Sequence, residues 1–378
     1  MSQGNYTGGY VKTPKQGIYK NVIELDFRSL YPSIILAHNI DPKTLNSKCN
    51  KKDRTYVPEF EKRYFCLTKK AKVPERLAKI LEKRAKVKKM LKSKKLKKDE
   101  RIKLEKKEKQ YKLAANITYG YFGYPKSPWY NINCAESISA FGRYYIQEVI
   151  KKAEKEGFKV IYGDTDSIFV QGTVSKAKSF AKKINSLFPD PIDIEYRGIY
   201  KRGFFVSKKK RYALIDSKDN ITIKGFETVR GDWCSIAKET QKKVIKKILQ
   251  EKHNAAAKEL RKAAIKIEKE NAKISDVTLS VQLTKPISQY KAKAPHVEAA
   301  KKLIKSGKKV EVNSIIKYVI TDRPGSISEK AEPVSSAKSY DKKYYIMNQI
   351  LPSSLRILQY SGIFESDILI GSLSKYKK

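Results

Sequence analysis

Histidine and cysteine are scarce in this 378-residue chain, which has three His and four Cys: His38, His253, His296, Cys49, Cys66, Cys134 and Cys234. The cysteines are widely spaced and form no CxxC pair, which argues against a zinc ribbon or a disulfide framework and fits reduced thiols inside a cell. The histidines are too few and too scattered for a His-based metal site. Any metal is therefore expected on carboxylates, as a hard ion such as Mg²⁺, with Mn²⁺ as a substitute.

Long apolar runs are also missing. No stretch approaches the roughly 18 consecutive apolar residues of a membrane-spanning helix, so none is expected. The N-terminal segment MSQGNYTGGYVKTPKQG has no apolar core, so no secretory signal is expected there. We predict an intracellular, cytoplasmic protein without a membrane partner, associated with the nucleoid if the source is prokaryotic.

Acidic residues are outnumbered two to one: 39 Asp plus Glu stand against 82 Lys plus Arg, giving a formal net charge of +43. Solubility needs only a modest net charge. A polyanionic partner is therefore expected, and nucleic acid is favoured over a membrane surface because no amphipathic anchor is evident. With 40% apolar residues the chain is able to bury a core, and its length allows two or three domains.

Apolar periodicity and turn residues predict the order of elements along the chain. A strand over 22–25 precedes a turn and a short helix, and 41–73 is irregular. Helices are expected over 133–156, 175–187 and 235–273, with Gly157 ending the first. Short strands fill 192–233, with turns at Gly203, at Asp219-Asn220 and at Gly225. The last hundred residues mix short helices with loops.

A strongly basic segment follows Pro74 and contains no further Gly or Pro up to about Ile117. Apolar residues recur in it at helical spacing, and a break over 93–99 would divide it into two antiparallel helices. Residues 69–112 contain 21 Lys or Arg against six acids. A solvated surface explains some of this charge, but an excess of that size in one hairpin indicates a site for anions.

Three aspartates are candidates for one metal site. Asp26 ends a strand, and Asp164 and Asp166 lie at the tip of a predicted β-hairpin, FKVIYGDTDSIFVQG. Residues i and i+2 share one face of an extended chain. Three carboxylates from two strands that meet would hold two divalent cations about 3.5–4 Å apart, the arrangement used in phosphoryl transfer. Each aspartate alone is more often a turn former.

Several ordered motifs resemble those of family B DNA polymerases, most clearly the archaeal members. DFRSLYPSII at 26–35, KLAANITYGYFGY at 112–124 and YGDTDS at 162–167 resemble motifs A, B and C. KKRY at 209–212 and YTGGYV at 6–11 resemble two further segments. QLTKPISQYKAKAPHVEAAKKL at 282–303 and YYIMNQILPSSLRIL at 344–358 resemble pieces of the thumb.

The resemblance implies an α+β fold with right-hand architecture. An antiparallel β-sheet palm would comprise residues 1–73 and 121–234. An αα-hairpin would form the fingers over 74–120, and a mainly helical thumb would follow over 235–378. The implied function is DNA-templated addition of dNTPs to a primer 3′-hydroxyl, so primer–template DNA and dNTPs are the expected partners, with two Mg²⁺ ions as cofactor.

The resemblance also assigns roles residue by residue. Asp26 and Asp166 would ligate both metals, the Phe27 carbonyl would complete a shell, and Asp164 would support the site. Further residues would surround the incoming nucleotide. Tyr31 would exclude a 2′-hydroxyl, Leu30 and Tyr31 would offer backbone amides, and Lys112, Asn116 and Arg84 would hold the β- and γ-phosphates. Lys88 is an alternative to Arg84. Lys112 would also protonate pyrophosphate, and Tyr119 and Gly120 would form the floor against the nascent base pair.

Residues expected at the DNA are Lys209, Lys210, Arg211, Tyr212, Tyr290 and Arg356. Family members usually carry an N-terminal domain and a 3′–5′ exonuclease domain before the YTGG segment, and this sequence shows neither. We therefore expect no proofreading of its own, and a separate polypeptide is a candidate source of both domains. The chain would then be a split-gene product, a recombinant fragment or a minimal enzyme. The tail GSLSKYKK shows no convincing sliding-clamp peptide.

Two other functions remain open. A catalytically inactive, polymerase-derived DNA-binding or scaffold subunit would keep the charge but commonly lose the metal carboxylates, all of which are present here. RNA polymerases and reverse transcriptases also use palm carboxylates, but the bulky Tyr31 argues against NTP use. Sequence does not decide whether the template is DNA or RNA.

Overall fold

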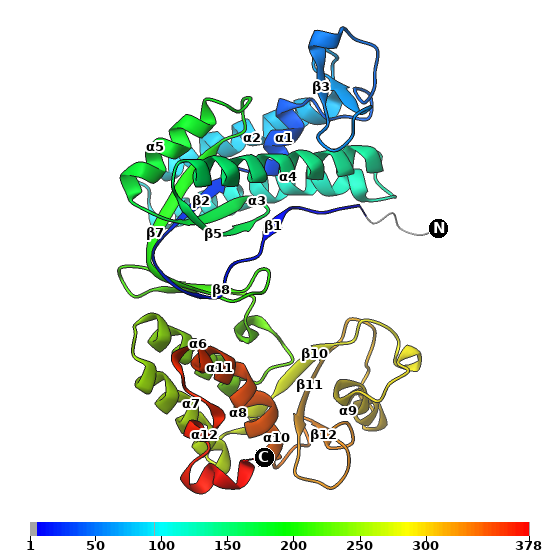
Figure 1. The fold of residues 1–378 in the computed structure, drawn as a ribbon. Coiled ribbons are helices and arrows are strands. Elements are labelled where there is room, and N and C mark those ends of the chain that lie inside the picture. Colours follow the sequence, from blue (N-terminus) through cyan, green and yellow to red (C-terminus); the bar gives the residue numbers. More distant parts are fainter. Residues whose placement is uncertain (1–5, 94, 378) are drawn as a thin grey trace. The chain divides into compact units, whose positions relative to one another are not determined.

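The computed structural model describes residues 6–93 and 95–377, and these residues group into two compact units. The first holds the chain to Lys15, Tyr19–Tyr200 and Ser207–Lys209, and the second holds Gln16–Ile18, Lys201–Val206 and the chain from Lys210. Each unit has its own apolar core. Both helices and antiparallel strands are present, which confirms the α+β prediction (Figure 1). None of the helices in the described part of the chain is long and apolar enough to cross a bilayer.

The first unit combines an antiparallel sheet with several helices. Its elements are β1 (Val11–Lys12), β2 (Gly17–Phe27), α1 (Leu30–Ala37), β3 (Arg54–Tyr56), β4 (Tyr64–Cys66), α2 (Lys72–Leu91), α3 (Lys98–Gly123), α4 (Ile132–Lys155), β5 (Lys159–Asp164), β6 (Ser167–Gln171), α5 (Val174–Asn185) and β7 (Ile194–Phe205). The strand order is β1-β5-β6-β2-β7. Strand β7 leaves this unit after Tyr200.

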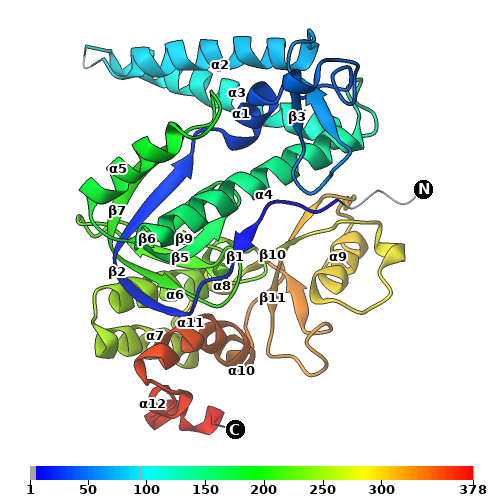
Figure 2. The same cartoon turned by 45° about the horizontal axis from the view of Figure 1, so that its top comes forward.

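One face of this sheet packs against helices, and the other face carries charged side chains near the end of β2. In β2, Ile23, Leu25 and Phe27 are buried, while the alternate residues Glu24 and Asp26 are half-buried. Helices α4 and α5 lie along the sheet (Figure 2), and their buried apolar residues belong to the same core cluster as Ile23, Leu25 and Phe27. Alternation along the strand therefore places Asp26 on the face away from these helices.

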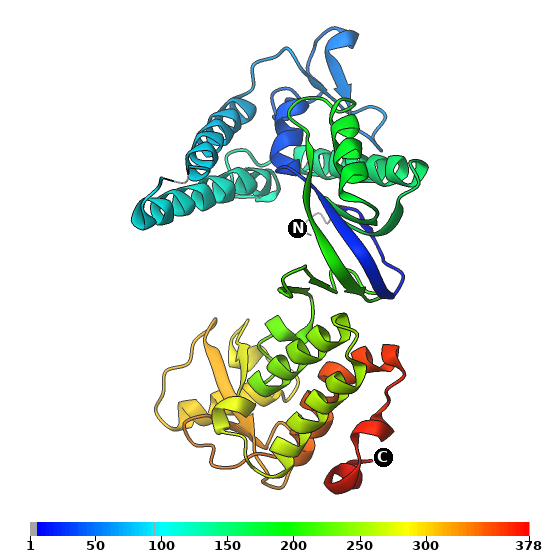
Figure 3. The ribbon, with the colours of Figure 1, turned by 90° about the vertical axis from the view of Figure 1, so that its left-hand side faces the viewer.

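The predicted helical hairpin is confirmed. Helices α2 and α3 run side by side as an antiparallel pair (Figure 3). Helix α2 begins at Lys72, two residues before the expected start, because Pro74 is tolerated in a first helical turn. The predicted β-hairpin is also confirmed: β5 pairs with β6, and Asp164 is opposite Ser167.

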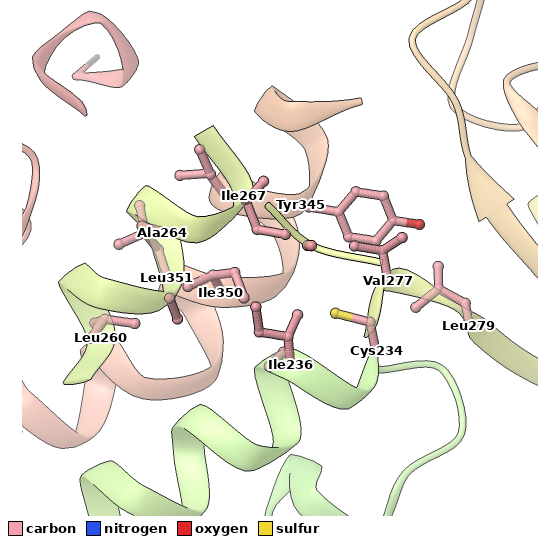
Figure 4. Packing of buried hydrophobic residues seen from close by; sticks show 14 of the residues in the cluster. Cys234, Ile236, Leu260, Ala264, Ile267, Val277, Leu279, Tyr345, Ile350 and Leu351 are labelled. Carbon is pink, nitrogen blue, oxygen red and sulfur yellow. The ribbon is translucent and has the colours of Figure 1, made fainter. Parts of the chain in front are cut away.

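The second unit is a helical layer beside a small sheet. Its elements are the end of β7, β8 (Tyr212–Ile215), β9 (Ile221–Lys224), α6 (Ser235–Leu249), α7 (His253–Glu268), α8 (Ile274–Val277), β10 (Leu279–Gln282), α9 (Pro295–Lys305), β11 (Ile315–Ile320), β12 (Ala331–Pro333), α10 (Lys342–Tyr344), a π-helical segment (Tyr345–Ile350), α11 (Leu351–Leu358) and α12 (Glu365–Ile368). Figure 4 shows part of its core, where α6, α7 and the segment around Ile350 meet.

Four local expectations need correction. Gly203 is not in a turn but within β7, opposite Leu214 of β8. The helix expected over 235–273 is two helices, α6 and α7, because folding back lets both bury their apolar faces in one core. Residues 41–73 contain the paired strands β3 and β4. The last hundred residues contain a three-stranded sheet in the order β10-β11-β12, which local periodicity did not indicate.

Candidate active site

The strand ends that carry the three aspartates lie together in the first unit. Ser167 of β6 pairs with Asp26 of β2 on one side and with Asp164 of β5 on the other. Directly opposite residues in neighbouring strands direct their side chains to the same face. The Phe27 N–H donates to the Asp166 carbonyl at 2.7 Å, which ties the end of β2 to the tip of the hairpin.

A cavity of about 480 Å³ opens beside these strand ends. It is lined by ten of the residues singled out from the sequence: Asp26, Phe27, Leu30, Tyr31, Arg84, Lys88, Lys112, Asn116, Tyr119 and Asp166. Asp164 and Gly120 are not among its lining residues. Strand β2, helix α1, both helices of the basic hairpin and the β5–β6 turn contribute to its wall. This volume is in the range of cavities that hold small molecules.

Asp26 is engaged by a cation that the sequence did not single out. Arg197 of β7 donates from Nε to Asp26 Oδ2 at 2.8 Å, and its NH2 group lies 2.8 Å from the same oxygen. Burial raises the pKa of the Asp26 carboxyl, and the hydrogen bond and charge of Arg197, with the charge of Lys112, oppose that rise. Arg197 thus holds the side chain predicted to ligate metal.

Arg84 is bound within the cavity wall. Its Nε donates to Glu108 Oε1 at 2.8 Å, and its NH1 donates to Ser29 Oγ at 2.7 Å. Ser29 has a left-handed backbone (φ 56°) just before α1. The guanidinium therefore connects α2, α3 and the turn after β2. Lys88, the alternative to Arg84, also lines the cavity.

Aromatic side chains form one side of the cavity. The Tyr31 and Tyr119 rings have centroids 4.6 Å apart, and burial raises the pKa of Tyr31 to about 12. The Tyr119 hydroxyl lies 3.0 Å from Ser139 Oγ and 2.8 Å from the hydroxyl of Tyr6. Tyr6 belongs to the YTGG segment, so this segment helps to fix the position of Tyr119.

Lys112 and Asn116 are one turn apart on α3, and both are exposed residues that line the cavity. The cavity therefore combines carboxylates from the sheet with cations and an amide from the hairpin. Cations and an amide are groups that bind phosphate oxygens, and carboxylates are groups that bind hard cations, so this composition suits both kinds of ligand.

The model of DNA polymerase family B matches residues 1–360. The chain belongs to that family. The DNA polymerase of Thermococcus gorgonarius is 40% identical over 380 residues, which cover 96% of this chain and 48% of that protein. DNA polymerase 2 of Aeropyrum pernix is 35% identical over 374 residues, covering 96% of this chain and 46% of that protein.

A solved structure is also similar. The family B DNA polymerase from the hyperthermophilic archaeon Pyrobaculum calidifontis matches with a TM-score of 0.69 and 32% identity, over 94% of this chain and 47% of that one. The resemblance deduced from the motifs is thereby confirmed, as is the polymerase fold. This family B chain spans about half the length of the curated relatives that it matches.

Four residues predicted at the DNA follow the β7 strand. Lys209 and Lys210 are exposed, and Lys210 has a left-handed backbone (φ 59°). Arg211 differs, because its NH2 donates to both carboxylate oxygens of buried Glu227, at 2.7 and 2.6 Å, and its guanidinium lies over the Phe226 ring. Tyr212 begins β8. The charge of Arg211 is thus neutralised within the second unit.

The two thumb-like candidates are placed differently. Tyr290 is half-buried, and its hydroxyl accepts a hydrogen bond from the Thr284 N–H at 3.0 Å. Arg356 is an exposed residue of α11. Contact of these residues with DNA stays a prediction.

Metal binding in this family B chain also stays a prediction. Within residues 6–93 and 95–377, no group of three or more His, Cys, Asp or Glu side chains is arranged to hold a metal ion. The donor chemistry nevertheless fits, because Asp26 and Asp166 line the same cavity and offer the oxygen ligands that Mg²⁺ prefers. Asp164 is the neighbour of Asp26 across Ser167.

Sequence reasoning missed several residues of the cavity wall: Arg28, Ser29, Pro32, Glu108, Thr165 and Arg197. Arg28 and Ser29 are within the DFRSLYPS motif, so the motif itself could have placed them at the cavity. Glu108 is one turn before Lys112 on the same face of α3, a spacing that also pointed to the cavity. No local signal indicated Arg197, because only the pairing of β7 beside β2 brings it to Asp26.

Proposed function

We propose that this chain is a DNA-templated DNA polymerase that adds dNTPs to a primer 3′-hydroxyl with the help of two divalent cations. The observation that carries this proposal is the single cavity that joins Asp26 and Asp166 to Arg84, Lys112 and Asn116. Membership of DNA polymerase family B supports the reaction class.

In the proposed reaction the 3′-hydroxyl releases its proton to water and its oxygen forms a bond to the α-phosphorus. The bond from that phosphorus to the oxygen that bridges to the β-phosphate breaks, and pyrophosphate leaves. Asp26 and Asp166 would hold Mg²⁺, with Asp164 in support and the Phe27 carbonyl as a further ligand. Bound Mg²⁺ supplies Lewis acidity that activates the hydroxyl and neutralises charge on the departing pyrophosphate. Residue Asp26 is half-buried, which strengthens its interaction with a cation.

The basic hairpin would hold the leaving group. A guanidinium binds phosphate oxygens through two parallel hydrogen bonds, so Arg84 would engage the β- and γ-phosphates together with Lys112 and Asn116. Lys112 would donate a proton to the pyrophosphate oxygen as the bond breaks. Leu30 and Tyr31 would present backbone amides to the phosphates.

The remaining residues would select and support the substrates. The Tyr31 ring would exclude a ribose 2′-hydroxyl, and Tyr119 and Gly120 would lie against the nascent base pair. The exposed Lys209 and Lys210 would contact the primer backbone, with Tyr212, Tyr290 and Arg356 as further DNA contacts. Phosphate contacts of this kind position the duplex without reading its sequence.

Primer extension with Mg²⁺ and dNTPs tests the proposal. Asp166→Ala is expected to abolish extension and to leave binding of a labelled primer–template within about twofold. The matched control is Glu105→Gln, because Glu105 is an exposed acid on α3 that does not line the cavity. Extension that survives Asp166→Ala would exclude the assigned site. Tight DNA binding without extension by the wild-type chain would favour an inactive, DNA-binding subunit.

A further inference from the structure

The contact between Arg197 and Asp26 places a fixed positive charge where the proposed function requires a metal ion. Both Nε and NH2 of Arg197 lie 2.8 Å from Asp26 Oδ2. The third nitrogen, NH1, lies 2.8 Å from Glu195 Oε1 on the same strand. All three guanidinium nitrogens are thus engaged by carboxylates, so the guanidinium is held in a defined orientation.

Arg197 belongs to a row of alternating charges at the cavity. Glu195 Oε2 accepts a hydrogen bond from Arg28 NH2 at 3.1 Å, and Arg28 NH1 lies 3.3 Å from Asp193 Oδ2. The order is therefore Asp26, Arg197, Glu195, Arg28 and Asp193. Within this row, Arg197 contacts Asp26 and Arg28 does not, although both arginines line the cavity.

A guanidinium and a divalent cation compete for the same carboxylate oxygen. The Nε hydrogen bond and the ion-pair contact of NH2 both fall on Oδ2, and a cation that approaches Asp26 also meets the positive charge of Arg197. The Asp26 side chain is 19% exposed and that of Arg197 is 44% exposed, so Arg197 has more solvent available on release than Asp26 has. Release of the guanidinium is thus feasible without exposing the core.

We propose that Arg197 is a built-in counter-cation of Asp26, which a divalent cation must displace from Oδ2 before the metal site forms. This inference rests on the proposed function, because it assumes that Asp26 is a metal ligand. Arg197 is a positioning residue in this scheme. It orients the carboxylate in the metal-free protein and weakens metal binding until a nucleotide triphosphate adds negative charge to the cavity.

Binding of Mn²⁺ to the full chain without DNA or nucleotide, followed by electron paramagnetic resonance, tests this inference. Arg197→Gln is expected to tighten Mn²⁺ binding about tenfold. Arg197→Lys keeps the charge and is expected to remain within about threefold of the wild type. Arg28→Gln is the matched control, because it removes the same charge from the same row without touching Asp26, and its Mn²⁺ affinity is expected to stay within about threefold.

Thermal unfolding gives a second readout that does not depend on activity. Without metal, Arg197→Gln is expected to unfold at a lower temperature than the wild type, and the gain in unfolding temperature on adding Mn²⁺ is expected to be larger. Unchanged or weaker Mn²⁺ binding by Arg197→Gln, or equal tightening by Arg28→Gln, would overturn the proposal.

Asp26→Asn separates this inference from the proposed function. If Asp26→Asn weakens Mn²⁺ binding and Arg197→Gln leaves it unchanged, Asp26 is a metal ligand and only the role of Arg197 fails. If Asp26→Asn leaves Mn²⁺ binding unchanged, the metal site of the proposed function fails, and the role of Arg197 fails with it.

Discussion

Arg84 of α2 and Glu108 of α3 form a guanidinium–carboxylate pair, with Nε and NH2 of Arg84 each 2.8 Å from Glu108 Oε1. The side chains are only 13% and 19% exposed, so solvent screens this pair less than a surface ion pair. Glu108 thus pairs with the Arg84 guanidinium, which is the group proposed to bind the triphosphate. Its carboxylate also adds a negative charge to the cavity.

Glu108→Gln is expected to lower the KM for dNTP by about threefold to tenfold with little change in kcat. Removing the carboxylate frees Arg84 for phosphate and removes a repulsive charge, which adds on the order of 1 kcal/mol to nucleotide binding. Steady-state incorporation kinetics measure the effect, and Glu105→Gln is the control. A higher KM would mean that Glu108 orients Arg84 for phosphate binding instead of competing with it.

The position of Tyr31 in the cavity wall gives a prediction about sugar selection. Tyr31→Ala is expected to raise ribonucleotide incorporation at least tenfold relative to dNTP, because the ring that would clash with a 2′-hydroxyl is removed. The ratio of kcat/KM for matched NTP and dNTP measures this. Unchanged discrimination would refute the assigned role.

A second variant tests the same ring without removing it. A Cβ built on Gly142 of α4 would lie 2.9 Å from Tyr31 Cε1, so Gly142→Ala requires the ring to move. We expect lower dNTP incorporation and altered sugar discrimination, with an overpacking cost of about 1–3 kcal/mol. Gly120→Ala is the comparison for stability, since nothing lies within 4 Å of its added Cβ.

Lys209 and Arg211 are expected to behave differently although both are in the KKRY segment. Lys209 is exposed, so Lys209→Gln should weaken binding to duplex DNA and reduce the slope of log affinity against log salt by about 1. Arg211→Gln should leave that slope unchanged. Salt titrations of DNA binding by fluorescence anisotropy measure both slopes.

Arg211→Gln should instead destabilise the second unit. Glu227 is 8% exposed and also accepts from Gln241 Nε2, so loss of Arg211 leaves a buried carboxylate without its cation. The expected cost is about 3–5 kcal/mol, measured by chemical denaturation. A reduced salt slope in this variant would restore Arg211 as a DNA contact.

His38 gives a prediction about pH. The residue is 7% exposed, its ring stacks on that of Phe141 with centroids 3.7 Å apart, and its ring nitrogens make hydrogen bonds of 2.8 Å with Thr55 and Tyr145. Burial lowers the pKa of His38 to about 3. The unfolded chain therefore binds this proton near pH 6.5, and the folded chain does not until about pH 3. The free energy of unfolding should fall as pH decreases through this window, by about 1.4 kcal/mol per pH unit.

Urea denaturation at pH 7, 6 and 5 measures this dependence. His38→Gln removes the titrating group and should flatten the decline, although its stability at pH 7 is expected to be lower because the ring stacking is lost. Tyr145→Phe removes one hydrogen bond but keeps the buried imidazole, so it should preserve the slope. An equally steep decline in His38→Gln would show that other groups cause it.

Much of the fold could be predicted because the signals were local. The basic hairpin α2–α3 and the β5–β6 hairpin depend on periodicity and turn residues within one segment, and both are confirmed. The sheet of β10, β11 and β12 was missed because its strands are separated by the helix α9 and by loops. Gly203 was misjudged because pairing with β8 overrides its preference for turns.

The sequence by itself determined the chemical inventory of this protein: carboxylates at strand ends, a basic helical hairpin and the ordered motifs of DNA polymerase family B. Periodicity and motif spacing are properties of neighbouring residues, so they survive without coordinates. Only the tertiary structure decided that Arg197 contacts Asp26 and that Glu108 contacts Arg84. Those partners are 171 and 24 residues apart in the chain, and no local pattern specifies which charges meet once strands pair and helices pack.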